Sequence, residues 1–307
     1  MVLQILVLGS AAGGGVPQWN CNGAVSRAAR AGLESAPLRT QASIAVSADG
    51  GNWVVINASP DLRQQILANQ RLWPAPGRLR DSPIKAVVLT GGEIDNVAGL
   101  LSLRERQAFT LWATGRVLGN LDANPIFEGL DRAIVERRTL ALDQRTSVTG
   151  PEGDLGLTID AFAVPGKVPL YMEKREKSLA GPPEETIGLA ISDGRHSFHF
   201  IPGCGAMNED IRRRIEGSSL LFFDGTLWRD DEMITAGLGS KTGQRMGHLS
   251  MSGPEGSMEL LAATPLGRRI FIHVNNSNMA LLADSPERQT LERAGWEVAH
   301  DGMEIEL

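Results

Sequence analysis

The stretch Ile84-Lys-Ala-Val-Val-Leu-Thr-Gly-Gly-Glu-Ile-Asp95-Asn96-Val-Ala-Gly-Leu-Leu-Ser-Leu103 decides the fold of this chain. Its first six residues form a short, largely β-branched apolar run, which is typical of a buried strand. The segment 97–103 favours a helix, and a polar turn, 91–96, separates it from the strand. Folds of the α/β class concentrate their chemistry at polar residues that follow a strand and precede a helix. The stretch therefore predicts an α/β fold with a candidate site at this turn.

The same turn resembles the metal-binding turn of the metallo-β-lactamase fold, which normally has the pattern His-x-His-x-Asp-His. Only the aspartate is present here, as Asp95, while Gly91, Glu93 and Asn96 occupy the three histidine positions. The resemblance implies a metal site in which other residues replace the usual histidine ligands. It argues against an ordinary two-zinc hydrolase.

Composition limits the classes of protein to which the chain can belong. With 307 residues, 42% of them hydrophobic, it can form one large domain or two modest ones. The net charge of -6 argues against a nucleic-acid partner. The apolar segment 1–9 has no basic region and is too short to span a membrane, so we expect a first strand, no membrane insertion and a cytoplasmic location. Two cysteines, Cys21 and Cys204, exclude a disulfide framework and a usual zinc finger.

Apolar runs and turn signals predict a mixed α/β chain with two β-rich halves. Strands are expected at 2–8, 42–48, 53–57, 84–89, 109–113, 155–163, 186–192, 197–202, 219–223 and 268–274. Helices are expected at 60–69, 95–106, 115–121, 131–136, 207–216, 254–263 and 286–294. The Asp301-Gly302 pair predicts a terminal hairpin. Residues 148–154 are interpreted as a linker. The charged segment 172–185 is interpreted as a solvated loop or, alternatively, as a lid or partner-contact loop near the site.

Four further strings are specific enough to point to a family. They are VLGSAAGGGVPQWNCN at 7–22, NASPDLRQQI at 57–66, MGHLS at 246–250 and IHVNNSN at 272–278. With these strings the chain resembles, essentially end to end, the PqqB family, the B proteins of pyrroloquinoline quinone (PQQ) biosynthesis. The resemblance implies a metallo-β-lactamase-like αββα four-layer sandwich, with residues 1–307 as a single domain.

The resemblance also implies a function. Its leading form is iron- and oxygen-dependent hydroxylation of the tyrosine moiety in a cross-linked Glu–Tyr precursor of PQQ, a small amino acid or short peptide. One alternative is a non-enzymatic carrier that transports PQQ or its precursor to the periplasm, and a zinc hydrolase is a third. The implied cofactor is Fe(II), with zinc as another occupant in purified protein. Other proteins of the PQQ pathway are the implied partners.

Four side chains are candidate metal ligands: Asp95, Asn96, His248 and His273. Asp95, His248 and His273 would form a two-histidine, one-carboxylate set with open positions, as in non-haem Fe(II) oxygenases, if the fold brings them together. Each also has a structural alternative. Asp95 can cap a helix, His273 can be a hydrogen-bonding residue at a strand end, and His248 can orient another ligand. Glu93 is either a replacement ligand or a solvated loop residue.

Substrate-binding candidates come from three other segments: Trp19, Asn20, Arg63 and Asp224. Asp224 follows a buried strand, where it faces the cleft or forms a turn. Residues 13–15, all glycine, complete no phosphate-binding motif and predict a tight turn that lets the backbone approach the cleft.

We expect neither cysteine to bind a structural zinc ion. Cys204 is interpreted as a buried structural residue or a second-metal ligand. Gly23 and Ser26 stand where family members have further cysteines, so the resemblance implies no structural zinc at Cys21. His196, His199 and His300 are given no function.

Overall fold

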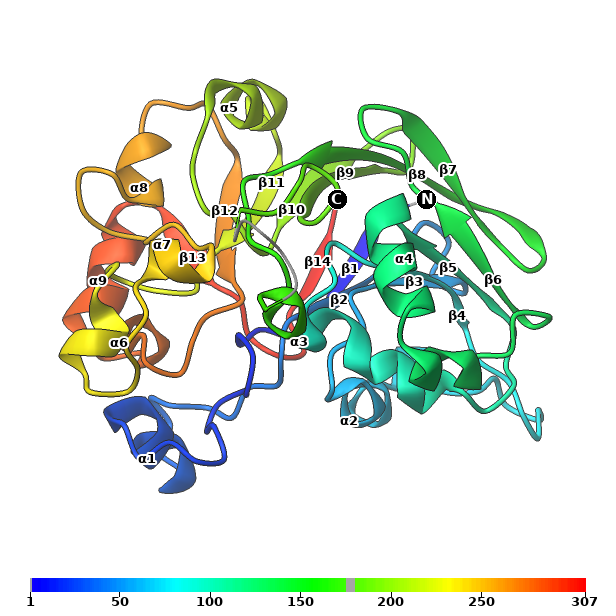
Figure 1. The fold of residues 1–307 in the computed structure, drawn as a ribbon, viewed down its shortest axis with the longest axis horizontal. Coiled ribbons are helices and arrows are strands. Elements are labelled where there is room, and N and C mark those ends of the chain that lie inside the picture. The colour runs from blue at the N-terminus through cyan, green and yellow to red at the C-terminus, as the bar shows by residue number, and fades with distance from the viewer. Residues whose placement is uncertain (1, 175–179) are drawn as a thin grey trace.

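The computed structural model describes residues 2–174 and 180–307. Two seven-stranded mixed sheets form its centre (Figure 1). The first sheet has the order β14 (Glu304–Glu306), β1 (Gln4–Gly9), β2 (Ser43–Ser47), β3 (Trp53–Ile56), β4 (Ile84–Val88), β5 (Phe109–Ala113) and β6 (Val135–Thr139). The second has the order β13 (Trp296–Val298), β12 (Arg268–Ile272), β11 (Leu220–Asp224), β10 (Ser197–Ile201), β9 (Ile187–Ser192), β8 (Gly153–Ala163) and β7 (Arg145–Gly150).

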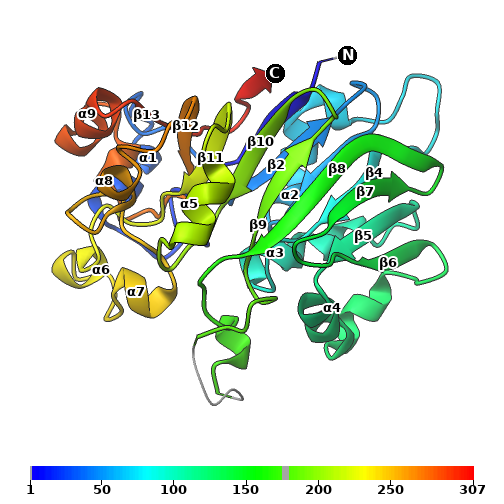
Figure 2. The same cartoon turned by 90° about the horizontal axis from the view of Figure 1, so that it is seen from above.

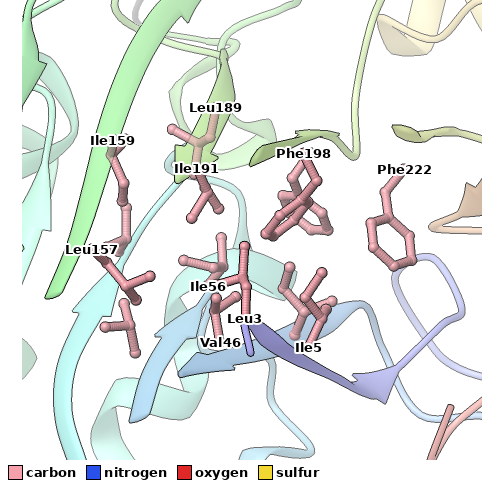
Figure 3. Close-up of a cluster of buried hydrophobic side chains, with 14 of the residues drawn as sticks. Leu3, Ile5, Val46, Ile56, Leu157, Ile159, Leu189, Ile191, Phe198 and Phe222 are labelled. Atoms are coloured by element: carbon pink, nitrogen blue, oxygen red, sulfur yellow. The ribbon is translucent and has the colours of Figure 1, made fainter. Parts of the chain in front are cut away.

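Side-chain alternation along the strands produces the layers. In β1, Ile5 and Val7 belong to the core between the two sheets, whereas Leu6 and Leu8 belong to the cluster beneath the helices. Such a split follows from the two-residue period of a strand, which places neighbouring side chains on opposite faces. Figure 3 shows residues of the two sheets meeting in the central core.

Helices cover both outer faces of the sheet pair (Figures 1 and 2). The first sheet packs against α2 (Leu62–Ala68), α3 (Ile94–Val97) and α4 (Gly115–Asp122), and the second against α1 (Ala24–Arg30), α5 (Glu209–Ile215), α8 (Ser257–Leu260) and α9 (Pro286–Arg293). The remaining helices are α6 (Glu232–Thr235), α7 (Gly243–Met246) and the 3-10 turns η1 (Gln70–Leu72), η2 (Ala98–Leu103), η3 (Pro125–Gly129), η4 (Leu170–Met172) and η5 (Met279–Leu281). The predicted αββα arrangement is thus confirmed.

Four sequence predictions of local structure are wrong, and three of them concern expected helices or a linker. The expected helix 131–136 is a turn followed by β6, an edge strand in which Val135 alone is buried, so the strand has no continuous apolar run. The expected linker 148–154 contains the turn of the β7–β8 hairpin, in which Gly150 pairs with Gly153. The expected helix 95–106 is divided into α3 and η2. Gly99 lies at this division, and its N–H donates to the carbonyl of Ala58 at 2.8 Å.

The terminal hairpin is also a wrong prediction, because β13 and β14 join different sheets. β13 pairs with β12, and β14 pairs with β1. Asp301 in the connecting turn accepts hydrogen bonds from the Ser10 hydroxyl at 2.8 Å and from the Thr40 amide at 2.7 Å. The Asp-Gly turn therefore ties the last strand to the first sheet.

The described part of segment 172–185 includes Glu173 at one end and the buried Glu185 at the other, while its residues 175–179 lie outside the described residues. Within the described part of the chain, every helix is too short or too polar to cross a membrane.

Candidate metal centre and its cavity

The candidate site lies where strands of both sheets end. Asp95 is in α3, just after β4, and Asp224 is the last residue of β11. His273 follows β12 directly, and His248 follows α7. Because β10, β11 and β12 run parallel, their carboxyl ends share one edge, which is where α/β sheets place ligands.

Two short contacts connect the four side chains. His273 Nε2 lies 2.8 Å from Asp95 Oδ2, and His248 Nδ1 lies 2.7 Å from Asp224 Oδ2. The two imidazole rings are stacked, with centroids 5.3 Å apart. One potential ligand atom from each of Asp224, His248 and His273 lies within 4.8 Å of the others, so these side chains could hold a metal ion.

Asp95 does not cap its helix, since the N-cap of α3 is Glu93. Its carboxylate instead contacts the ring of His273, which follows β12 of the second sheet. Burial raises the pKa of Asp95, but the hydrogen bond and charge of His273 outweigh burial and lower the net pKa. Burial lowers the pKa of His273, but Asp95 outweighs it and the net pKa is raised. The pair therefore favours an ionised carboxylate beside a protonated imidazole.

Asp224 is fully buried and surrounded by hydrogen-bond donors. Its Oδ1 accepts from the Thr226 amide at 3.0 Å and from the Thr226 hydroxyl at 2.6 Å. Its Oδ2 accepts from the Cys204 amide at 2.8 Å. Burial raises its pKa, but the charge and hydrogen bond of His248 lower the net pKa. Asp224 is thus an ionised anchor for His248.

Thr226 determines which imidazole nitrogens face the cavity. Its hydroxyl donates to Asp224, so the 2.9 Å contact with His273 Nδ1 requires that Nδ1 to donate. His248 Nδ1 likewise donates to Asp224. These tautomers follow from the hydrogen-bond network. Both Nε2 atoms are therefore directed away from the anchoring groups, and Nε2 is a nitrogen that binds metals in proteins.

The backbone at His273 is constrained. Its φ of 59° lies in the left-handed region, which residues other than glycine rarely adopt. Such conformations persist where the surrounding structure fixes them, and they cluster at functional sites.

A cavity of about 480 Å³ opens onto these side chains. Asp95, Asn96, Thr226, His248 and His273 are among its lining residues. Gly13 also lines it, and a Cβ there would come within 3.5 Å of Asp95 Oδ2. The positions of residues 13–15 agree with the predicted turn that lets the backbone approach the cleft.

Glu93 is engaged away from the two histidines. It forms an ion pair with Lys167, and its Oε2 accepts from the Leu170 amide at 3.2 Å. Cys204 is buried, and burial together with the charge of Asp224 raises the pKa of its thiol to about 12. A neutral thiol favours the structural interpretation of Cys204.

All four predicted substrate-binding residues lie outside the cavity lining. Trp19 is 86% exposed, and Asn20 is exposed and accepts a hydrogen bond from Gln18 at 2.7 Å. Arg63 is exposed on α2. Asp224 lies beneath the histidines rather than at the cavity surface. Gln18, two residues before Asn20, does line the cavity.

Sequence reasoning missed Thr226, Lys167 and Lys241. The position of Thr226 two residues after Asp224 was the only signal available for it. The two lysines carried no motif, although both line the cavity.

Gly23 and Ser26, the two residues at the positions of further cysteines in family members, supply no thiolate beside Cys21. A Cβ on Gly23 would lie 3.3 Å from Cys21 Sγ, and Ser26 is buried.

Comparison with known proteins identifies the family of the chain. A family model described as a beta-lactamase superfamily domain matches residues 52–274, so the chain belongs to the beta-lactamase superfamily. The coenzyme PQQ synthesis protein B of Gluconacetobacter diazotrophicus is 58% identical over 306 residues, covering 99% of both chains. The protein of the same name from Xanthomonas campestris pv. campestris is 56% identical over 99% of this chain and 100% of its own. Within the superfamily, the chain therefore belongs to the coenzyme PQQ synthesis protein B family.

Solved structures support the same assignment. The Zn²⁺-bound PqqB of Methylobacterium extorquens superposes with a TM-score of 0.94 at 48% identity, covering 99% of this chain and 100% of that one. A diphosphatase of the PhnP family superposes with a TM-score of 0.68 at 20% identity, covering 100% and 98%. The second likeness shows the fold alone.

Proposed function

We propose that this protein is an iron- and oxygen-dependent hydroxylase in PQQ biosynthesis, acting on the tyrosine moiety of a cross-linked Glu–Tyr precursor. The observation that carries the proposal is the meeting of His248, His273 and Asp95 on the wall of one cavity. Two histidines and one carboxylate with open positions form the ligand pattern of non-haem Fe(II) oxygenases.

The donor set proposed here, two imidazoles and one carboxylate, has the chemistry of a divalent-metal site. His248 and His273 would bind through Nε2, since their Nδ1 atoms are engaged by Asp224 and Thr226. Asp95 would be the carboxylate ligand, with its Oδ2 already 2.8 Å from His273 Nε2. Asp224 would act through His248, because carboxylates that bind the second nitrogen of a metal-binding histidine orient the ring and raise its basicity.

The chemistry then divides between the metal and the chain. A bound Fe(II) supplies the redox chemistry with dioxygen that ring hydroxylation needs. Thr226 and Asp224 would hold the Nδ1 protons, which leaves Nε2 of each ring as the nitrogen for a metal. In the metal-free protein Asp95 favours a proton on His273 Nε2, and this nitrogen would bind a metal only in its deprotonated form. The cavity has a volume in the range of sites for small molecules.

The carrier hypothesis is the second candidate, and the metal-binding turn favours it. Gly91 has no side chain, and Glu93 is paired with Lys167, so Asp95 is the clearest ligand that the turn retains. With so few ligands we expect weak metal binding, and the cavity would then bind a precursor without transforming it. The same scarcity of ligands disfavours a zinc hydrolase with two metals.

The decisive experiment compares Fe(II)-loaded parent protein with His273→Ala. Oxygen uptake and hydroxylated product are measured on the cross-linked Glu–Tyr amino acid. We expect turnover by the parent and none by the variant, with circular dichroism confirming that the variant is folded. His300→Ala, at an exposed histidine, is the matched control and should keep full activity.

Undiminished turnover by His273→Ala would place the metal elsewhere. A parent protein that binds the precursor but consumes no oxygen would favour the carrier hypothesis.

A further inference from the structure

Two lysines line the cavity beside the metal-binding turn. Lys167 follows β8 and pairs with Glu93, and Lys241 precedes α7. The stem of Lys167 packs on Gly247, next to His248, where an added Cβ would lie 3.1 Å from Lys167 Cγ. Lys167 therefore occupies the same part of the cavity wall as the loop that carries His248.

A carboxylate of the chain itself, that of Glu173, faces these lysines at long range. Glu173 Oε1 lies 3.6 Å from Lys167 Nζ and 3.5 Å from Lys241 Nζ, and Oε2 lies 3.4 Å from an Arg245 nitrogen. Charge-assisted hydrogen bonds normally measure about 2.7–2.9 Å. Oε1 is buried and has no hydrogen-bond partner within the described residues. The Glu173 carboxylate is thus attracted by the charges of the two lysines and Arg245, but its hydrogen bonds to them are long or absent.

The ion pairs that the structure describes around Glu173 join more cations than carboxylates. Lys167, Lys241 and Arg245 are three cations, and they face two carboxylates, Glu93 and Glu173. In these ion pairs between described residues, the cations outnumber the carboxylates by one. A second, well-placed carboxylate would satisfy ammonium groups that Glu173 reaches only at long distance.

We propose that Lys167 and Lys241 form a subsite for a substrate carboxylate and that Glu173 competes for it intramolecularly. The inference rests on the proposed function, since a linked glutamate and tyrosine carries carboxylates on both of its halves. It names the substrate class as a small aromatic acid with several carboxylates.

The rest of the cavity suits the aromatic half of such a molecule. Ile94 and Leu170 line the cavity, with 50% and 55% of their surfaces exposed. Exposed apolar side chains beside fixed charges are typical of sites that bind an apolar body and a charged end. The ring would contact these two residues while its carboxylate reaches the lysines.

Binding affinity tests the subsite without depending on turnover. The full chain is loaded with Zn(II), which has no redox chemistry and so prevents reaction. Calorimetry then measures binding of the cross-linked Glu–Tyr amino acid and of its analogue with every carboxylate converted to a carboxamide. The variants are Lys241→Gln, Glu173→Gln and, as matched control, Lys85→Gln, whose lysine pairs with Glu152 outside the cavity lining.

We expect Lys241→Gln to weaken binding of the acid by roughly ten-fold, the value of one charge-assisted hydrogen bond. Glu173→Gln should tighten it several-fold because the competitor is neutral, and Lys85→Gln should leave it unchanged. The carboxamide analogue should bind the parent and Lys241→Gln equally.

Equal affinity of the parent and Lys241→Gln for the acid, weaker binding by Glu173→Gln, or no binding of the acid by the parent would each overturn the subsite. The expected affinity pattern in a protein that never hydroxylates the acid would support the subsite while refuting the hydroxylase. Hydroxylation of the acid without this pattern of affinities would support the hydroxylase while refuting the subsite.

Discussion

Replacing Thr226 with valine tests whether one hydroxyl prepares both histidines for a metal. Valine has nearly the shape of threonine but cannot accept the Nδ1 proton of His273 or donate to Asp224. The Thr226 amide still donates to Asp224 at 3.0 Å, so the carboxylate stays anchored. The substitution therefore acts mainly on the tautomer and orientation of His273.

The expected magnitude follows from these contacts. Loss of a group that orients a metal ligand typically weakens metal binding about 10–100-fold, or about 1.4–2.7 kcal/mol. Thr226 is 5% exposed, so the His273 N–H is also left without its partner in a largely buried place. An unpaired buried donor costs about 1–3 kcal/mol, which should lower the stability of the metal-free protein.

The assay is competition for Zn(II) against a chromophoric chelator, with thermal unfolding of the metal-free protein measured in parallel. Thr226→Ser is the matched control because it retains the hydroxyl and loses only a methyl group. We expect the serine variant to bind Zn(II) within a few-fold of the parent. If Thr226→Val binds Zn(II) as tightly as Thr226→Ser, the hydroxyl does not prepare the site and the ligand assignment is wrong.

Three further predictions concern other parts of the chain. Burial lowers the pKa of His199 to about 4. Below the unfolded-state pKa of about 6.5, the unfolded chain therefore binds a proton at this residue that the folded chain does not bind. The free energy of unfolding consequently falls as the pH decreases towards 4. Between about pH 7 and pH 4.5, the free energy of unfolding measured with urea should fall by about 2 kcal/mol less for His199→Gln than for the parent. The exposed control His196→Gln should behave like the parent. Cys21→Ser should leave the zinc content unchanged, and zinc lost specifically from this variant would show a structural site. Residues 1–150 expressed alone should show no cooperative unfolding, because their core face packs against the second sheet, and a stable fragment would contradict the single-domain prediction.

Prediction from sequence succeeded where local patterns and family strings agree. Asp95, His248 and His273 were selected from three separate segments, and the structure brings all three to one cavity. Their convergence was implied only by the fold, since nothing local relates a residue of α3 to one that follows β12 178 positions later.

Prediction failed where long-range pairing decides the structure. The Asp301-Gly302 turn has the local chemistry of a hairpin, yet the hydrogen bonds of Asp301 to Ser10 and Thr40 tie it to the first sheet. Trp19 lies in a specific string, but its neighbour Gln18 lines the cavity in its place, and Arg63 lies in another such string without lining the cavity. A sequence string identifies a segment and not the direction of each side chain.

The substituted turn is better explained as a change of ligand than as a loss of function. Gly91 has no side chain where the fold usually has an imidazole, and a Cβ there would lie only 3.1 Å from Asn96 Nδ2, while Glu93 pairs with Lys167. Asp95 remains directed at His273. One edge of the turn thus keeps the carboxylate that we propose as a metal ligand, while the other fixes a lysine that we assign to the substrate. In the proposed hydroxylase, a site with fewer metal ligands would leave coordination positions and cavity wall for a second reactant, as a reaction of dioxygen with an organic acid requires.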